Sequence, residues 1–187
     1  MRKRLLLLSV AAASLLCSLP LSYAQDAVFK IGLILPLTGP FASTGKQLEA
    51  GARLYLSQQG DTVAGKKVQL IVKDDTGVPD VTKRVAQELI VNDKVQVLAG
   101  FGLTPLAMAT APIATQSKTP MVVMAAATSS VTEASPYIVR TSFTVPQVVT
   151  ILADWAIKND IKKVAGLNVL RVLREAEKVS AKLSKHE

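Results

Sequence analysis

Apolar positions along the chain follow two spacings that alternate from one segment to the next. Nearly continuous apolar runs are typical of buried strands, whereas repeats every three or four residues are typical of amphipathic helices. Strict alternation of such segments predicts an α/β fold built on a doubly wound, mostly parallel sheet with right-handed crossovers. Strands are predicted at 29–35, 67–73, 95–99, 120–124 and 161–167, with an extended segment at 137–141, and helices at 47–59, 80–92, 104–116 and 147–158.

The loops after the strands are the expected binding positions, because ligands of doubly wound sheets lie outside the carboxyl ends of the strands. Such loops are predicted at 36–45, 74–79, 100–104 and 125–130. They contain many Gly, Ala, Ser and Thr residues, which leave room for a ligand and offer it hydroxyl groups and backbone amides. The sequence therefore predicts a small-molecule site at this edge of the sheet.

The small polar residues in these loops also have a structural interpretation, and the sequence leaves both open. Ser43 and Thr44 either hold a polar ligand group at the start of a helix or cap that helix, and the same choice applies to Thr104. Thr128 and Ser129 either contact a ligand or belong to a loop that is simply rich in small residues.

Two adjacent acids, Asp74 and Asp75, follow the second predicted strand. Metal binding or acid–base chemistry would need further ligands or partners, and the single histidine of the chain, His186, lies near its end. A structural role in loop contacts is therefore predicted for both acids. Asp80 is predicted to cap the helix at 80–92.

The loop from Gly39 to Lys46 resembles a phosphate-binding loop only superficially. A Walker loop has four residues between its glycines and then Lys followed by Ser or Thr, but here five residues separate Gly39 from Gly45 and Gln47 follows Lys46. The sequence also has no GxSxG nucleophile motif. We therefore expect a binding protein rather than an enzyme, with no cofactor and no metal.

Residues 1–24 have the pattern of a secretory signal peptide. Three cations at 2–4 precede an apolar stretch at 5–21, and Ser22-Tyr23-Ala24 predicts cleavage after Ala24. The stretch is short and contains Pro20, which argues against a retained membrane anchor. The single cysteine, Cys17, lies within this leader, so the exported part contains no disulfide and depends on its hydrophobic core.

The formal charge of +8 includes the three cations of the leader, which leaves +5 for residues 25–187. The remaining Lys and Arg residues are scattered, often beside acids, and form no stripe interleaved with aromatic residues. Such a distribution is typical of a solvated surface and argues against nucleic-acid binding.

Four segments together resemble the periplasmic leucine/isoleucine/valine-binding proteins, which are the type I substrate-binding proteins of ABC importers. They are FKIGLILPLTGPFASTGKQLEAGARL, KDDTGVPDVTKRVAQELI, VQVLAGFGLTPLAMATAPIA and TPMVVMAAATSS, and the resemblance runs from about residue 29 to 165. It implies a two-lobed α/β fold that closes around an amino acid or related small carboxylate in the periplasm. The first lobe would span 27–142, and 143–187 would form part of the second. The implied protein partner is an inner-membrane ABC permease.

The same resemblance implies which residues contact the ligand. The ligand carboxylate would be held by the hydroxyl of Thr104 and by backbone and hydroxyl groups of Ala126 and Thr128. The pocket for the rest of the ligand would involve Thr44, Gly102 and Leu103. The family often has an aromatic residue where Thr44 stands, so a wider or more polar pocket is expected here.

After residue 165 the sequence GLNVLRVLREAEKVSAKLSKHE departs from the family pattern. A frameshift or premature stop is the hypothesis for this junction, and a chain truncated in this way is expected to bind weakly or not at all, because closure of two lobes is what buries the ligand. Two alternatives remain open: a ligand-sensing domain of a receptor, and a fragment without function. The leader and the failed phosphate motif disfavour a nucleotide-using enzyme.

Overall fold

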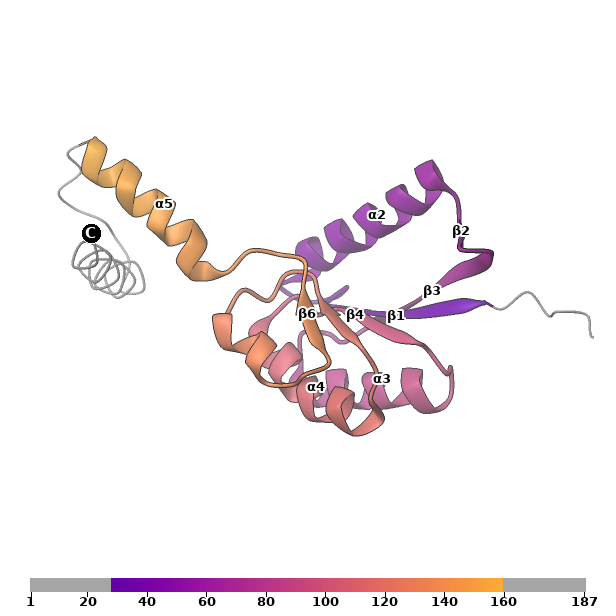
Figure 1. Ribbon diagram of the computed structural model, residues 1–187. Helices are drawn as coiled ribbons and strands as arrows, with labels where there is room; N and C mark the ends of the chain where they lie inside the picture. The colour runs from indigo at the N-terminus through magenta and orange to yellow at the C-terminus, as the bar shows by residue number, and fades with distance from the viewer. Residues whose placement is uncertain (1–27, 160–187) are drawn as a thin grey trace, which may run out of the picture.

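The computed structural model describes residues 28–159, which form a single sheet with helices on both faces (Figure 1). The strand order is β2-β3-β1-β4-β5-β6. Neighbouring strands pair in parallel, except that the short β2 returns as an antiparallel hairpin on β3. In chain order the elements are β1 (Phe29–Leu35), α2 (Ala42–Gln59), β2 (Thr62–Val63), β3 (Lys66–Asp74), α3 (Pro79–Val91), β4 (Val97–Gly100), α4 (Thr104–Ser117), β5 (Met121–Val123), the 3₁₀ helix η1 (Ser129–Glu133), β6 (Ile138–Arg140) and α5 (Val145–Lys158). The predicted α/β fold with a mostly parallel sheet is confirmed.

Two hydrophobic clusters lie on opposite faces of the sheet. Alternate residues of β1 point to opposite sides, as the period of a strand requires, so Ile34 belongs to one cluster and Leu33 and Leu35 to the other. The larger cluster lies under α3 and α4, where Leu89 is fully buried. The smaller one lies under α2, which contributes Leu48. Figure 1 shows α2 alone on its face of the sheet and α3 and α4 together on the other.

Helix α2 begins five residues before the predicted start at residue 47. The reason is a close approach between Gly45 and the end of β1, where a Cβ on Gly45 would stand 2.1 Å from the carbonyl oxygen of Pro36. Only a glycine lets the first turn of the helix pack so closely. Ser43 and Thr44 therefore lie inside the first turn, and the N-cap position is Phe41, which makes no side-chain capping bond. The capping alternative for Ser43 and Thr44 is wrong.

Two other predicted caps are also wrong, and proline explains both. Helix α3 begins at Pro79 after the extended Val78, and the carboxylate of Asp80 accepts a hydrogen bond from Lys83 at 3.1 Å instead of capping the helix. Helix α4 begins at Thr104 with Leu103 at its N-cap, so Thr104 does not cap it. A proline in the first turn has its φ already set for a helix and has no N–H that needs a partner.

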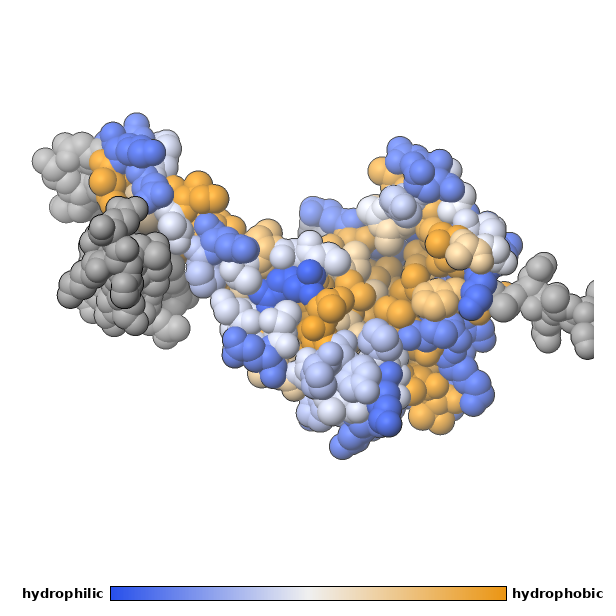
Figure 2. Space-filling model, in the orientation of Figure 1, coloured by the Kyte–Doolittle hydropathy of each residue, from blue (hydrophilic) through white to orange (hydrophobic). Residues whose placement is uncertain are grey.

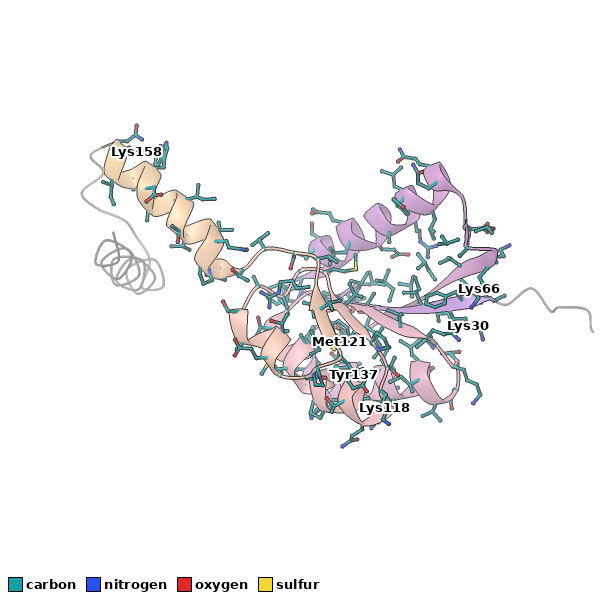
Figure 3. All side chains as sticks on the ribbon, in the orientation of Figure 1. Lys30, Lys66, Lys118, Met121, Tyr137 and Lys158 are labelled. Carbon is teal, nitrogen blue, oxygen red and sulfur yellow. The ribbon has the colours of Figure 1, made fainter. Side chains whose placement is uncertain are left out.

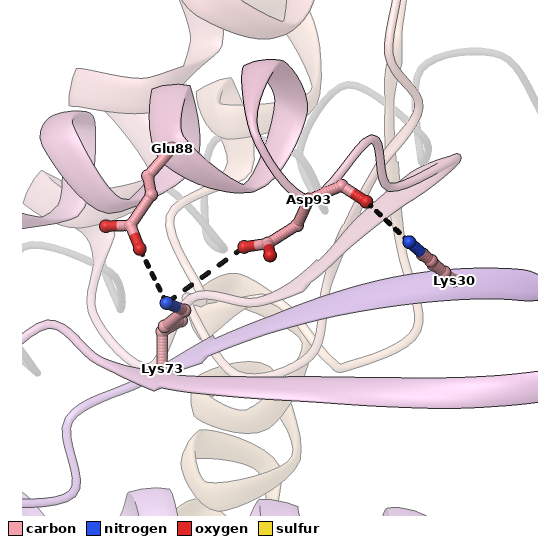
Figure 4. A network of polar contacts seen from close by, with 4 residues as sticks. All are labelled: Lys30, Lys73, Glu88 and Asp93. Carbon is pink, nitrogen blue, oxygen red and sulfur yellow. Dashed lines mark hydrogen bonds and ion pairs between the residues drawn. The ribbon is translucent and has the colours of Figure 1, made fainter.

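A polar network fastens the end of α3 to two strands (Figure 4). The Lys73 ammonium on β3 donates to Glu88 at 2.6 Å and lies 4.0 Å from Asp93, while Lys30 on β1 donates to the Asp93 carbonyl oxygen at 3.0 Å. The hydrogen bond with Glu88 raises the pKa of Lys73, and the same bond lowers the pKa of Glu88. The network holds α3 in register with the sheet.

The sheet ends at β6, and the chain then continues into α5, which projects away from the sheet (Figure 1). Most apolar side chains of α5 are exposed, including Ile151, Trp155 and Ile157, and Figure 2 shows this apolar surface along the helix. Among residues 28–159, no helix combines the length and the hydropathy that crossing a bilayer requires. The predicted leader, the strand expected at 161–167 and the tail lie outside the described residues.

Basic side chains lie on separate elements of the described fold. Figure 3 shows Lys30 and Lys66 towards the amino end of the sheet, Lys118 at the end of α4 and Lys158 at the far end of α5. The same view places Met121 and Tyr137 together on β5 and the approach to β6, where the Met121 amide donates to the Tyr137 carbonyl oxygen at 2.9 Å.

Candidate ligand-binding site

The loops that follow β1, β4 and β5 gather at one edge of the sheet. These strands are neighbours in the order β1-β4-β5 and run parallel, so their carboxyl ends lie together. Every residue predicted to contact a ligand lies in these loops or in the first turn of the helix that follows, namely Thr44, Gly102, Leu103, Thr104, Ala126 and Thr128. The fold thus brings the loops together at the edge where doubly wound sheets bind their ligands.

Thr104 and Thr128 meet at this edge. Their hydroxyl oxygens lie 2.9 Å apart and share a hydrogen bond in which either can be the donor. Whichever hydroxyl accepts this bond keeps its own hydrogen free for a ligand oxygen. Thr104 is half-buried at the start of α4, and Thr128 is exposed immediately before η1.

The start of α4 adds one amide to this pair. Leu106 donates to the Leu103 carbonyl oxygen at 3.2 Å, and Pro105 has no N–H, which leaves the Thr104 amide without an intrahelical partner. A helix N-terminus favours negative charge through its free amides and its dipole. The first turn of α4 therefore provides one free amide, and the bonded pair of threonines provides one free hydroxyl hydrogen.

The backbone after β4 is held in an unusual conformation that positions the residues of the site. Gly100 has φ +113°, and a Cβ there would lie 2.1 Å from the Ile34 carbonyl oxygen. Phe101 follows in the left-handed region at φ +63°, with its side chain fully buried. Its amide donates to the Ile34 carbonyl oxygen at 3.0 Å. Strain of this kind persists only where the surroundings fix the chain, and here it directs Gly102 and Leu103 over the end of β1.

Ala126 is buried, and its backbone amide is already engaged. The amide donates to the Phe101 carbonyl oxygen at 3.0 Å. The carbonyl oxygen is therefore the backbone group of Ala126 that can contact a ligand, and it can only accept hydrogen bonds. This restricts Ala126 to hydroxyl or ammonium groups and leaves a carboxylate to Thr104 and Thr128.

Phe41 is a residue of this edge that the sequence did not single out. Its side chain is 44 % exposed, and both its Cδ2 atom and the Cδ1 atom of Leu103 lie within 4.0 Å of the place where a Cβ on Gly77 would stand. The loops after β1, β3 and β4 therefore converge there. An exposed ring beside Leu103 supplies the apolar and aromatic surface that the half-buried Thr44 does not. The sequence signal for Phe41 is an aromatic residue directly after Pro40 in a predicted binding loop.

The predicted structural role of Asp74 and Asp75 is confirmed. Asp74 accepts from the Leu37 amide at 2.8 Å, the Thr38 hydroxyl at 2.6 Å and the Thr76 amide at 2.8 Å, which ties the loop after β1 to the end of β3. Partial burial alone would raise the pKa of Asp74, but these hydrogen bonds together outweigh it and lower the pKa.

Asp75 is fully buried below this loop. It accepts from the Gly77 amide at 2.9 Å and the Thr82 hydroxyl at 3.3 Å, and its burial raises its pKa.

Within the part of the chain that the structure describes, no group of three or more His, Cys, Asp or Glu side chains stands close enough to bind a metal.

Arg140 was also missed by the sequence analysis. It is the last residue of β6, and its Nη2 atom donates to the Thr128 carbonyl oxygen. The Val145 amide donates to the neighbouring Ala127 carbonyl oxygen at 2.9 Å. A lone arginine at the end of a short strand carries no signature of such a contact.

A surface hollow of about 380 Å³ lies at the other end of the strands, between α2 and the β2–β3 hairpin. Its lining includes Arg53, Asp61 and Lys67 and none of the predicted ligand-binding residues. It is therefore separate from the site formed by Thr104 and Thr128.

Comparisons with known proteins agree with this architecture. The family model described as periplasmic binding protein matches residues 28–170. The Leu/Ile/Val-binding protein homolog 6 of Brucella abortus (strain 2308) is 46 % identical over 151 residues, which are 80 % of this chain and 39 % of that protein.

Two solved structures extend the comparison. A solute-binding protein of an ABC transporter from Rhodopseudomonas palustris BisB5, in complex with 3,4-dihydroxybenzoic acid, is 58 % identical with a TM-score of 0.76 over 80 % of this chain and 43 % of that one. Another from R. palustris, in complex with 4-hydroxybenzoate, is 39 % identical with a TM-score of 0.75 over 81 % and 44 %. The chain thus spans about two fifths of the length of these relatives, which are described as binding proteins. Its sheet has the type I periplasmic-binding-protein fold, and the chain belongs to the periplasmic binding protein family.

Proposed function

We propose that the chain binds a small carboxylate as the solute-binding component of an ABC importer, and that an aromatic carboxylate is the preferred ligand. The observation that carries this proposal is the pair of hydroxyl groups on Thr104 and Thr128, 2.9 Å apart at the start of α4. One free hydroxyl hydrogen and one free amide match the two oxygen atoms of a carboxylate, which accepts hydrogen bonds and donates none.

Three observations favour an aromatic carboxylate over an amino acid. The relatives at 58 % and 39 % identity are described in complex with 3,4-dihydroxybenzoic acid and 4-hydroxybenzoate. The acids at this edge, Asp74 and Asp75, are engaged in loop contacts, so neither is free to pair with the ammonium group of an amino acid. The exposed ring of Phe41 offers a surface on which an aromatic ligand can stack.

The remaining parts of the proposal follow from the family and the leader. Residues 1–24 direct export to the periplasm, 27–142 form the first lobe, and 143–187 begin the second. The projection of α5 away from the sheet supports a boundary near residue 142 (Figure 1). The ligand would be delivered to an inner-membrane ABC permease.

Calorimetric titration of protein expressed from the full chain tests the proposal. The ligands are 3,4-dihydroxybenzoate, 4-hydroxybenzoate, benzoate, leucine, isoleucine and valine, and folding is checked by circular dichroism. We expect weak but saturable binding of the aromatic acids, because a single lobe leaves the ligand open to solvent, and no binding of the amino acids. Saturable binding of leucine alone would contradict the ligand class, and no binding by folded protein would contradict the function of this chain.

A further inference from the structure

The guanidinium group of Arg140 has an unusual environment beside the candidate site. One nitrogen, Nη2, donates to the Thr128 carbonyl oxygen, while Nε and Nη1 are buried without a hydrogen-bond partner among the described residues. None of the ion pairs between residues 28 and 159 includes Arg140. Burial of a charged group is costly unless it is paired and hydrogen-bonded, and only one of the three nitrogens of Arg140 has a partner among the described residues.

The carbonyl group that Arg140 contacts belongs to Thr128, the same residue whose hydroxyl bonds to Thr104. Apart from Arg140, the Thr128 carbonyl oxygen accepts only the amide of Val131, at 3.2 Å, within the part of the chain described. This short loop has no strand partner of its own, so its orientation depends on individual hydrogen bonds. The contact with Arg140 fixes the direction of the Thr128 carbonyl group, and thereby the side from which the Thr128 hydroxyl meets Thr104.

A second bond ties the same loop to the segment that leaves the sheet. The Val145 amide, at the first residue of α5, donates to the Ala127 carbonyl oxygen at 2.9 Å. Arg140 and Val145 therefore hold two successive carbonyl groups, one from each end of the segment 141–144. These two hydrogen bonds connect the loop that contains Thr128 to the segment between the sheet and α5.

We propose that Arg140 is a positioning residue for ligand binding, which acts through the Thr128 carbonyl group to set the Thr128 hydroxyl against Thr104. This rests on the function proposed above. Arg140 need not touch the ligand for this role.

Hydrogen–deuterium exchange of protein expressed from the full chain tests the positioning without any ligand. The variant is Arg140→Met, which keeps much of the side-chain volume and removes every donor. The matched control is Arg53→Met, which removes an exposed arginine paired with Glu49 on α2. We expect about tenfold faster exchange in peptides that contain 126–131 and the Val145 amide, with no change in β1. Unchanged exchange at 126–131, or an equal increase throughout the sheet, would overturn the proposal.

Titration with 3,4-dihydroxybenzoate adds a second arm. We expect Arg140→Met to weaken binding about tenfold and Arg140→Lys, which keeps one donor, to weaken it less. Because Arg140 acts through Thr128, the double variant Arg140→Met/Thr128→Val should bind no more weakly than Thr128→Val alone. Losses that simply add would overturn the proposal. If the unmodified protein binds no ligand, the proposed function fails, and the exchange experiment still decides whether Arg140 positions Thr128.

Discussion

The hydroxyl oxygens of Thr104 and Thr128 lie 2.9 Å apart although 24 residues separate them in the sequence. They meet because β4 and β5 are adjacent and parallel, and each threonine follows one of these strands. The strained turn at Phe101 fixes one side of the pair, and Arg140 contacts the other. The site is therefore a product of sheet topology, with its final geometry set by a few hydrogen bonds.

Replacement of the Thr128 hydroxyl should weaken carboxylate binding. Thr128→Val keeps the shape of the side chain but removes the donor, and a hydrogen bond to a charged group is worth about 1.5–3 kcal/mol. We expect the Kd for 3,4-dihydroxybenzoate to rise by about tenfold to a hundredfold, measured by calorimetry. Thr132→Val is the matched control, because Thr132 is exposed on η1 and, among residues 28–159, its hydroxyl bonds only to the Ser129 carbonyl oxygen at 3.3 Å. Equal losses in the two variants would contradict the assignment.

The sequence predicted β1 to the residue, because a nearly continuous apolar run of strand length ends at Pro36. It also predicted that the loops after β1, β4 and β5 would lie at one edge, since parallel strands gather their carboxyl ends there. It did not predict the start of α2, because the approach of Gly45 to Pro36 depends on packing between segments and not on local pattern.

Helix caps and the contact of Arg140 were not predictable for a similar reason. Asp80 and Thr104 are good capping residues, but the adjacent prolines determine where α3 and α4 begin. The bond from Arg140 joins two segments of irregular backbone, and no periodicity marks the residues that form it. Patterns predict elements and their order, whereas single polar contacts depend on the assembled sheet.

Phe41 should contribute selectively to aromatic ligands. Phe41→Leu keeps an apolar side chain but removes the ring, whose stacking with an aromatic ligand is worth about 0.5–1.5 kcal/mol. We expect the Kd for 3,4-dihydroxybenzoate to rise about threefold to tenfold, while the thermal unfolding midpoint changes little because the ring is 44 % exposed. Phe143→Leu, which alters another exposed ring, is the control. Unchanged affinity in Phe41→Leu would exclude Phe41 from the pocket.

Gly100 and Gly51 should respond to alanine in opposite directions. At Gly100 a Cβ would stand 2.1 Å from the Ile34 carbonyl oxygen, and φ is +113°, so Gly100→Ala should lower the free energy of unfolding by more than about 3 kcal/mol. At Gly51, inside α2, nothing lies within 4 Å of a Cβ, and Gly51→Ala should raise it by about 0.5–1 kcal/mol. Urea unfolding measures both, and a stable Gly100→Ala protein would contradict the strained turn.

Asp75 should reduce the stability of the fold increasingly as the pH rises. Burial raises its pKa in the folded state above the value of about 3.9 expected in the unfolded chain. Between these two pKa values the folded protein binds more protons than the unfolded one, so stability falls as pH rises through this window. Asp75→Asn removes the titrating group but keeps an oxygen that accepts from the Gly77 amide. Its amide nitrogen can donate to the Thr82 hydroxyl, which already donates to the Val78 carbonyl oxygen at 2.9 Å.

The free energy of unfolding of Asp75→Asn should therefore exceed that of the unmodified protein by little at pH 4 and by more towards pH 7, as measured by urea unfolding at several pH values.

Asp74→Asn provides the opposite case. The pKa of Asp74 is lowered in the fold, so its charged form stabilises the protein above the unfolded pKa and loses this effect as the pH falls. Asp74→Asn should accordingly cost most at pH 7, because an amide cannot accept all three hydrogen bonds from Leu37, Thr38 and Thr76 as well as a carboxylate does. If both variants showed the same pH dependence, the contrast between the buried acid and the loop-binding acid would be wrong.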